Sequence, residues 1–234
     1  MTYTILGRCA RTGRLGIGIA TFSITVGRYC HGVRAMTGVT VSQAFANETN
    51  NQLALRLLAQ GFTAGSVLSH LKSNDPDFEY RQIGVIDRSG TAAAYTGPGT
   101  RGWSGHLAAD NYVACGNGLV GPGVVEAIAA GFKAKPDADL EERLLMGIEA
   151  GRDAGGQGTT ALHKPERSSA LLVYSRYAYA DIDLRVDLHA TAVEELRRVY
   201  GEYKRYEGYY ADRGRNPRGA MSQEAFMSKL QAAE

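Results

Sequence analysis

The sequence has few cysteines, no long apolar run and no apolar leader. Its three cysteines, Cys9, Cys30 and Cys115, are odd in number and widely spaced, and none forms a CxxC pair. This argues against a disulfide framework and a structural zinc site, so we expect small buried thiols. No window approaches the roughly 18 apolar residues that a membrane span needs. The N-terminal residues lack the apolar core of a signal peptide. We therefore predict a cytoplasmic protein that does not enter a membrane.

The sequence also lacks an excess of either charge. Charged residues make up 21% of the chain and the formal net charge is +2. Such a balance predicts neither disorder nor a polyanionic partner. The segment RRVYGEYKRYEGYY near the C-terminus looks basic and aromatic, but residues 187–234 contain eight Lys/Arg and eight Asp/Glu. No basic patch is left to attract phosphates, so we predict no nucleic-acid partner.

What the sequence does contain is apolar residues and glycine. The 234 residues are 44% hydrophobic and include 29 glycines. This is enough for one sizeable core with many tight turns. No long linker divides the chain. We therefore predict one domain over residues 1–190, followed by a helical extension over residues 191–234 that packs on the domain or on a partner subunit.

Local patterns predict strands and helices in alternating groups. Segments rich in β-branched and aromatic residues indicate strands at 2–9, 15–27, 33–46, 79–90, 91–97, 111–117, 168–175 and 179–187. Apolar residues at helical spacing indicate helices at 51–62, 64–74, 121–132, 137–151, 192–210 and 222–233. Thr63 is expected to cap the second helix. Residues 152–167 are expected to form a polar, glycine-rich loop.

Helices that come in pairs between runs of strands argue against a βαβ nucleotide-binding fold. No GxGxxG joins a strand to a helix, and the glycine-rich segment 116–123 lacks the Lys and Ser/Thr of a phosphate-binding loop. The order of elements favours the α+β class, as a four-layer αββα sandwich of two mostly antiparallel sheets with a C-terminal helical tail.

Seven segments together resemble a known family. They are MTYTILGR (1–8), TFSITVG (21–27), VSQAFAN (41–47), YRQIGVIDRSG (80–90), AYTGPGTRGWSGH (94–106), YVACGNGLVGPGVVEAI (112–128) and IDLRVD (182–187). Their joint order resembles the domain of unknown function (DUF) 1028 family, which is grouped with the N-terminal-nucleophile (Ntn) hydrolase-like folds. The resemblance covers roughly residues 2–200. Residues 22–25 and 152–167 depart from the family pattern, and we expect both segments to line a substrate path.

The resemblance implies hydrolysis of a C–N amide bond in a small molecule, without a cofactor. In Ntn hydrolases a terminal Thr, Ser or Cys is both nucleophile and base, because its α-amino group has a pKa near 8. Thr2 is the candidate here, and removal of Met1 before so small a residue would expose its amine. While Met1 is present, Thr2 has no free amine. The alternative is a non-catalytic ligand-binding or assembly protein on the same scaffold.

Two further catalytic candidates lie in the matching segments. Asn117, within Gly116-Asn117-Gly118, ends a strand before a helix, where backbone N–H groups favour an oxyanion. The alternative is a tight turn with Asn in a left-handed conformation. His106 and Trp103 are expected to combine as a polar tip and an aromatic wall of the site, and the alternative for His106 is an ordinary structural histidine.

Substrate-binding candidates are Ser23, Gln43, Asn47, Arg81 and Gln82, together with Trp103 and Gly116. Ser23 is expected on the second strand beside Thr2, or as an ordinary strand hydroxyl. Gln43 is a candidate amide donor to an oxyanion, as is Asn47, for which a helix cap is equally plausible. Arg81 begins an apolar strand with Gln82 beside it, and binds either a substrate carboxylate or an internal one.

The five histidines show no metal-ligand spacing, so no metal is predicted. The C-terminal helix carries a stripe formed by Val193, Leu196, Tyr200, Tyr203 and Tyr210. Tyrosines among charged neighbours are typical of a wet interface. The sequence therefore predicts a small-molecule substrate and a homo-oligomer formed through this helix.

Overall fold

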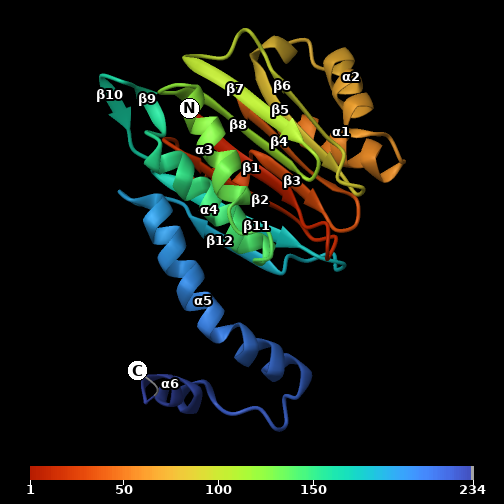
Figure 1. Ribbon diagram of the computed structural model, residues 1–234. Helices are drawn as coiled ribbons and strands as arrows, with labels where there is room; N and C mark the ends of the chain where they lie inside the picture. The colour runs from red at the N-terminus through yellow and green to blue at the C-terminus, as the bar shows by residue number, and fades with distance from the viewer. Residues whose placement is uncertain (233–234) are drawn as a thin grey trace. The chain divides into compact units, whose positions relative to one another are not determined.

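The chain opens with the antiparallel hairpin that the sequence predicts. In the computed structural model, which describes residues 1–232, β1 (Thr2–Arg8) pairs with β2 (Leu15–Thr21) along their whole lengths (Figure 1). The register places Thr2 opposite Thr21. Gly13 in the connecting turn has φ 72°, a conformation that glycine adopts without penalty. β1 and β2 form the centre of the larger sheet.

The larger sheet contains eight strands within the described residues. Its path runs β10, β9, β8, β1, β2, β11 and β12, and β7 also pairs with β8. The remaining strands are β7 (Trp103–Ala109), β8 (Tyr112–Leu119), β9 (Gln157–Thr159), β10 (Leu162–Lys164), β11 (Ser168–Tyr174) and β12 (Ile182–Val186). Each neighbouring pair is antiparallel.

The smaller sheet has, among residues 1–232, four antiparallel strands in chain order. They are β3 (His31–Arg34), β4 (Gly38–Ala44), β5 (Arg81–Asp87) and β6 (Ala92–Thr96). One face of this sheet packs on the larger sheet through a core that includes Leu6, Ile17, Val41 and Val113. Successive residues of a strand point to opposite faces, so every second residue points into this shared core.

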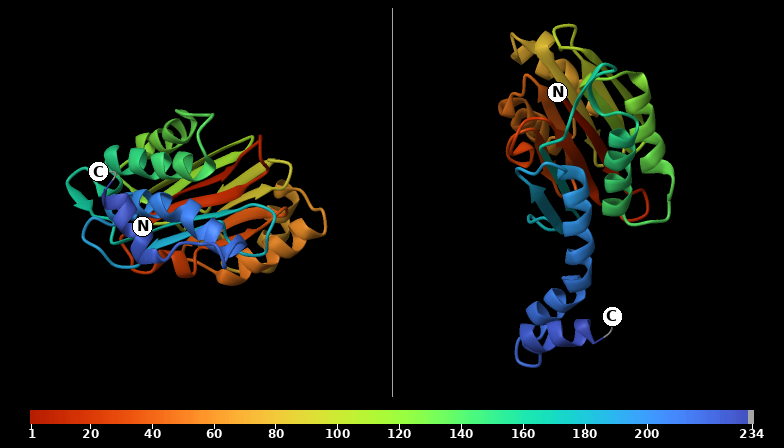
Figure 2. Two further views of the ribbon diagram at one scale, coloured as in Figure 1. Left: turned by 90° about the horizontal axis from the view of Figure 1, so that it is seen from below. Right: turned by 90° about the vertical axis from the view of Figure 1, so that its left-hand side faces the viewer.

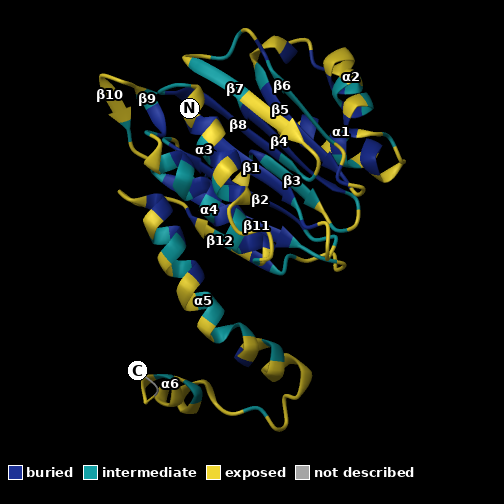
Figure 3. Cartoon of the chain, in the orientation of Figure 1, coloured by how far each residue is buried: buried dark blue, intermediate teal, exposed yellow. Residues whose placement is uncertain are grey.

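A pair of helices covers each outer face. α1 (Glu48–Ala59) and α2 (Ala64–Asn74) lie on the smaller sheet, and α3 (Pro122–Lys133) and α4 (Leu140–Asp153) lie on the larger one (Figure 2). Gly16 and Gly18 of β2 let α4 approach closely: a β-carbon at Gly18 would lie 2.9 Å from Ile148. Buried residues concentrate in the two sheets (Figure 3). The result is four layers, helix–sheet–sheet–helix.

Most predicted elements are confirmed, with shifted ends. Thr63 caps α2 by accepting a hydrogen bond from the Ser66 amide, and all three cysteines are buried and free. Two predictions were wrong. No strand was predicted over Trp103–Ala109, where alternation is hidden by Gly, Ser and Ala. The segment 152–167 is no plain loop, because it contains the β9–β10 hairpin.

The chain divides into one unit from Met1 to Leu196 and a second from Arg197 onward. α5 (Ala192–Arg215) begins in the first unit, where Val193 and Leu196 are buried, and continues into the second. α6 (Gln223–Gln231) follows; residue 233 of the predicted last helix and residue 234 of the predicted extension lie outside the described residues. No helix among residues 1–232 has both the length and the apolar composition needed to cross a bilayer.

Within the second unit, α5 and α6 meet through aromatic rings. Tyr209 stacks on Phe226 with ring centroids 4.3 Å apart, and Tyr206 meets the same Phe226 edge-on. The predicted stripe is partly wrong at its end, because Tyr209 is buried whereas Tyr210 is 45% exposed. Tyr206 and Tyr209, three residues apart on α5, share the helix face that meets Phe226 of α6.

Candidate functional site

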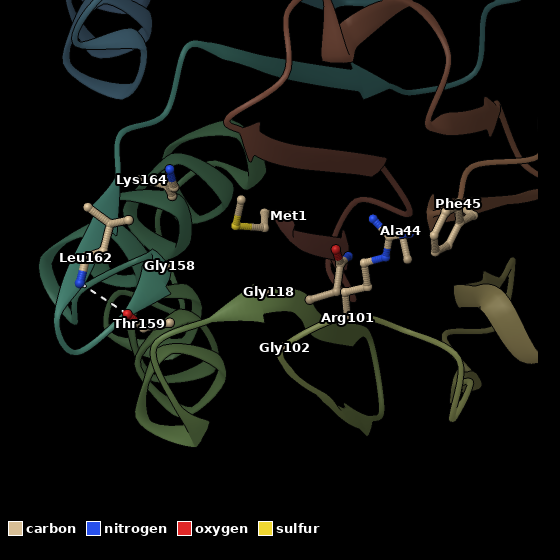
Figure 4. A pocket seen from close by; sticks show the side chains of 11 residues that line it. Met1, Ala44, Phe45, Arg101, Gly102, Gly118, Gly158, Thr159, Leu162 and Lys164 are labelled. Carbon is tan, nitrogen blue, oxygen red and sulfur yellow. Dashed lines mark hydrogen bonds between the residues drawn. The ribbon is translucent and has the colours of Figure 1, made fainter.

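A cavity of about 460 Å³ opens beside the N-terminal end of β1 (Figure 4). Its walls come from five places: Met1, the end of β4, the loop before β7, the end of β8, and the β9–β10 hairpin. The sequence predicts that the segments 22–25 and 152–167 line a substrate path. Only the second contributes to this cavity, through Gly158, Thr159, Leu162 and Lys164.

Thr2 lies at this end of the sheet and faces the space between the two sheets. Thr2, Thr21 and Asn117 are register partners on neighbouring strands, so their side chains share one face. Thr4, two residues along, bonds to Gln43 of the smaller sheet, which identifies that face as the inner one. Thr2 is 6% exposed. Its side chain is therefore buried between the two sheets, at the N-terminal end of the central strand β1.

The hydroxyls of Thr2 and Thr21 are hydrogen-bonded at 3.1 Å. Thr21 Oγ1 donates its proton to the Met1 carbonyl at 2.6 Å, so the proton in the first bond belongs to Thr2. Thr21 Oγ1 also accepts from the Ser23 amide at 3.3 Å. Through these three bonds Thr21 fixes the orientation of the Thr2 hydroxyl.

Met1 forms the wall of the cavity next to Thr2. Its side chain is 40% exposed and lies against Gly118, where a β-carbon would come 2.1 Å from Met1 Cγ. In Figure 4 Met1 lies between Lys164 on one side and Arg101 on the other. Partial burial lowers the pKa of the Met1 amino group, because desolvation disfavours its charged form.

A β-bulge at Gly118 interrupts the sheet beside this wall. Trp103 pairs with Leu119 and Ser104 pairs with Asn117, so Gly118 has no partner on β7. Gly118 has φ 63°, the left-handed conformation of a bulge glycine. Ala44, which also lines the cavity, has φ 70°, which costs free energy for a residue with a β-carbon. Of these two residues only Ala44 is strained, because glycine adopts a positive φ without penalty.

A buried chain of amides holds Asn117. Its Nδ2 donates to Gln82 Oε1 at 3.1 Å, and the same oxygen accepts from Gln43 Nε2 at 2.8 Å. Gln43 Oε1 accepts from Thr4 Oγ1 at 2.6 Å, and Gln82 Nε2 donates to the Gly116 carbonyl at 2.8 Å. Gln43 and Gln82 are fully buried. Because every bond here has a defined direction, the Asn117 amide can adopt only one orientation.

Comparison with known proteins decides the family. The model of the family of unknown function DUF1028 matches residues 2–196. The chain belongs to the DUF1028 family. Protein SPO2555 from Silicibacter pomeroyi, another DUF1028 structure, is similar over 90% of this chain and 88% of its own, with 29% identity and a TM-score of 0.80. A search of curated proteins gives no match.

Other similar structures are more distant. Thiobacillus denitrificans BPH in complex with epoxomicin is 14% identical over 74% of this chain and 98% of its own, with a TM-score of 0.43. Anbu (ancestral beta-subunit) from Yersinia bercovieri is 12% identical over 86% of this chain and 94% of its own, with a TM-score of 0.40.

In this DUF1028 chain His106 does not line the cavity. Its Nδ1 lies 2.8 Å from Thr96 Oγ1, which accepts from Gln82 Nε2 at 2.9 Å. His106 therefore reaches Asn117 only through Thr96 and Gln82. Although its side chain is exposed, partial desolvation of the ring lowers the pKa of His106. His106 is thus linked to the amide chain through Thr96 and does not line the cavity.

Trp103 and His106 do not combine into one wall. The Trp103 ring lies over Gly105, within 2.7 Å of where a β-carbon would be, whereas His106 faces Thr96 of the smaller sheet. Alternation along β7 sends residues 105 and 106 to opposite faces. The expected pairing of these two residues was wrong for this reason.

The helix start expected at Gly116-Asn117-Gly118 is also absent from the described structure. β8 continues to Leu119 and α3 begins only at Pro122. The side of Gly116 where a β-carbon would lie faces Tyr3 and Leu119 instead, and the Gly116 carbonyl accepts a hydrogen bond from Gln82 Nε2. Of these three residues, Asn117 and Gly118 line the cavity.

Ser23, Asn47 and Arg81 lie outside the cavity lining. β2 ends at Thr21, so Ser23 is on an exposed bend and not on the strand. Asn47 caps α1 by accepting from the Thr49 amide, which is the cap alternative. Arg81 pairs with buried Asp75 at 2.9 Å, which is the internal ion-pair alternative.

Sequence reasoning missed Arg101 and Phe45, which line the cavity, and did not single out Lys164 within the segment 152–167. The three residues come from separate segments with no common spacing, so no local signal joins them. The thiols of Cys30 and Cys115 offer no competing nucleophile, because desolvation raises the pKa of each to about 12. Among residues 1–232 no three His, Cys, Asp or Glu side chains gather as metal ligands.

Proposed function

We propose that this chain is an Ntn-type hydrolase that cleaves a C–N amide bond in a small molecule, with Thr2 as nucleophile and base after removal of Met1. The observation that carries the proposal is that Thr2 lies buried at the start of a central strand, facing the space between the sheets, with Met1 as cavity wall beside it. The four-layer order with this placement of Thr2 supports an Ntn-hydrolase-like fold.

Loss of Met1 changes the site in two ways. It frees the α-amino group of Thr2, and it removes the carbonyl that takes the proton of Thr21. Thr21 Oγ1 then has a proton to donate to Thr2. Partial burial already lowers the pKa of the amine at Met1, and the same environment favours a neutral Thr2 amine. A neutral amine beside the hydroxyl is the base that the reaction requires.

In the first half-reaction Thr2 Oγ1 attacks the amide carbonyl carbon while the α-amino group of Thr2 takes the hydroxyl proton. The C–N bond then breaks, and the departing amine receives that proton from the α-ammonium group. Thr2 is left as an acyl ester. In the second half-reaction the α-amine takes a proton from water, the hydroxide attacks the ester, and the carboxylic acid leaves as Thr2 recovers its proton.

Asn117 and Gly118 are the residues we assign to the oxyanion. One Nδ2 proton of Asn117 binds Gln82, and the second is directed by the same fixed amide plane. Gly118 lies unpaired in the bulge next to it. Donors that are held in place before the reaction stabilise developing negative charge without reorganisation. Gln43 and Gln82 are positioning residues that orient Asn117, and His106 adds to them through Thr96.

N-terminal mass analysis with an acylating probe tests the proposal. We expect the purified protein to be lighter by one methionine residue. We expect a small β-lactone to open on Thr2 and add its mass to the chain. Thr2→Ser should still be labelled, Thr2→Ala should not, and Thr12→Ala, which removes an exposed hydroxyl, should behave as wild type. Labelling of Thr2→Ala at the wild-type rate would refute the assignment.

The alternative is a ligand-binding or assembly protein without hydrolysis. It is favoured by one observation: only 6% of Thr2 is exposed, which leaves little of this residue for a substrate to reach. Hydrolysis requires removal of Met1, because Thr2 can act as base only through a free amine. Intact Met1 in every preparation, with no labelling of Thr2, would therefore favour this function.

We also propose that the helical extension packs on the domain or on a partner copy, and that the chain forms a homo-oligomer. In the second unit Tyr210 and Met227 remain 45% and 42% exposed beside the stacked rings of Tyr209 and Phe226. Sedimentation analysis should give more than one copy per particle, and Tyr210→Asp should lower that number. A wild-type monomer at all concentrations would contradict it.

A further inference from the structure

We propose that the substrate of this site is an amide that carries a carboxylate, of the N-acyl amino acid class, and that Arg101 and Lys164 bind this carboxylate. The inference rests on the proposed function where it calls the bound molecule a substrate. The binding of a carboxylate does not depend on hydrolysis. It is carried by the charge and placement of the residues that line the cavity.

The cavity contains two cationic side chains and no anionic one. Among its lining residues, Arg101 and Lys164 are basic and none is Asp or Glu. Within residues 1–232 neither of the two cations forms an ion pair. Arg81, by contrast, is held by Asp75 at 2.9 Å. The charges of Arg101 and Lys164 therefore remain available to an anion in the cavity.

Aromatic rings support both cations in place of carboxylates. The Arg101 guanidinium lies 5.1 Å from the Phe45 ring centroid, and Lys164 Nζ lies 5.5 Å from that of Phe22. Arg167 lies 5.5 Å from the same Phe22 ring. A cation over a ring is oriented without being neutralised. This arrangement keeps each charge and limits the movement of its side chain.

The two cations come from different walls, on either side of Met1. Arg101 belongs to the loop before β7, and Lys164 to β10 (Figure 4). An anion bound by either one lies beside the position that Met1 now occupies, next to Thr2. Apolar walls around few charges focus their field within a cavity. Arg101 presents a planar fork that matches a carboxylate, and Phe45 and Leu162 offer apolar surface to the acyl part.

Binding to a variant that lacks the nucleophile tests the inference separately from catalysis. Thr2→Ala protein without Met1 is titrated calorimetrically with a panel of short N-acyl amino acids and with the neutral primary amide of each. We expect at least one acid to bind about tenfold or more tightly than its amide, a difference of about 1.4 kcal/mol. Arg101→Gln and Lys164→Gln should each remove most of that preference.

Arg88→Gln and Lys72→Gln, which remove the same charges outside this cavity, are the matched controls and should leave the preference unchanged. Equal affinity for acids and amides, no binding by any acid, or an unchanged preference in Arg101→Gln and Lys164→Gln together would overturn the inference. Tighter binding of inorganic phosphate than of every acid would identify a phosphate site and would also overturn it.

Failure of the two proposals can be told apart. A preference for acids in the Thr2→Ala protein, with no amide cleaved by wild type, would leave the carboxylate site standing and refute the hydrolase. Cleavage of neutral amides as fast as acids, without a preference in binding, would do the reverse.

Discussion

Met1 occupies the space that a side chain at Gly118 would need. A β-carbon built on Gly118 would lie 2.1 Å from Met1 Cγ and 3.0 Å from Met1 Cβ. Gly118 also has φ 63°, where residues with a β-carbon are strained. A glycine here thus does two things: it forms the bulge of β8 and it gives Met1 room beside Thr2.

Gly118→Ala should destabilise the protein by about 1–3 kcal/mol through backbone strain alone, and by more when Met1 is present. Urea unfolding of the Met1-bearing and Met1-free forms measures both parts. Gly123→Ala is the control, because a β-carbon there meets nothing within 4 Å and Ala favours the helix. The same loss in both forms would show that Met1 does not lie against Gly118.

Replacement of Gln82 should test the amide chain that orients Asn117. Gln82→Met keeps a similar volume but removes the hydrogen bonds of Gln82 to the Gly116 carbonyl and to the Asn117 and Gln43 amides. Buried unsatisfied groups cost about 1–3 kcal/mol each, so we expect a loss of about 2–4 kcal/mol in the free energy of unfolding. Gln52→Met, on the exposed side of α1, should change it little. Equal effects of both changes would contradict the buried network.

His31 should make stability depend on pH between about 6.5 and 4. Burial, with a smaller effect of Arg185, lowers the pKa of His31 to about 4. Folded His31 stays neutral in this range while the unfolded chain takes up a proton, so stability falls as pH decreases from 6.5 to 4. The size should be about 1–3 kcal/mol. Urea unfolding at several pH values measures it.

His31→Gln should flatten this pH dependence, because no group at position 31 then gains a proton on unfolding. His163→Gln, at an exposed position, should retain the wild-type slope. A wild-type slope in His31→Gln would show that another group is responsible.

Asp75 should make the stability of the protein depend on pH in a lower range than His31 does. Desolvation opposes its ionisation, but hydrogen bonds from Arg81, Asn50 and Asn47 outweigh that effect and hold the pKa of this carboxyl well below its usual range. The unfolded carboxyl takes up a proton first, so its stabilising effect is present above about pH 4 and is lost as pH falls further.

Asp75→Asn should therefore reduce stability at neutral pH by about 2–4 kcal/mol, since it removes the buried one of the two carboxylates that pair with the largely buried Arg81. The deficit should shrink below pH 4, which unfolding at pH 7 and pH 3 would show. Asp77→Asn is the matched control, because Asp77 is 65% exposed and 3.8 Å from the same Arg81. A deficit that stays constant with pH would contradict the role of the charge.

Much of the fold could be predicted from local patterns. The β1–β2 hairpin, the two helix pairs and the capping of α2 by Thr63 follow from alternation, helical spacing and turn residues. β7 escaped prediction because Gly, Ser and Ala weaken alternation, and because its place is set by pairing with β8. Sequence patterns report which face a residue prefers, but not which strand it will lie beside.

The site was predicted less completely for the same reason. The sequence by itself determined the family, the position of Thr2 at the start of a strand, and Asn117 as a nearby polar group. Only the tertiary structure decided that Asp75 pairs with Arg81, that Gln82 accepts a hydrogen bond from Asn117, and that Arg101 and Lys164 line one cavity from distant segments. Partners of this kind depend on contacts between strands and loops far apart in the chain, and the free energy of those contacts exists only once the layers have packed.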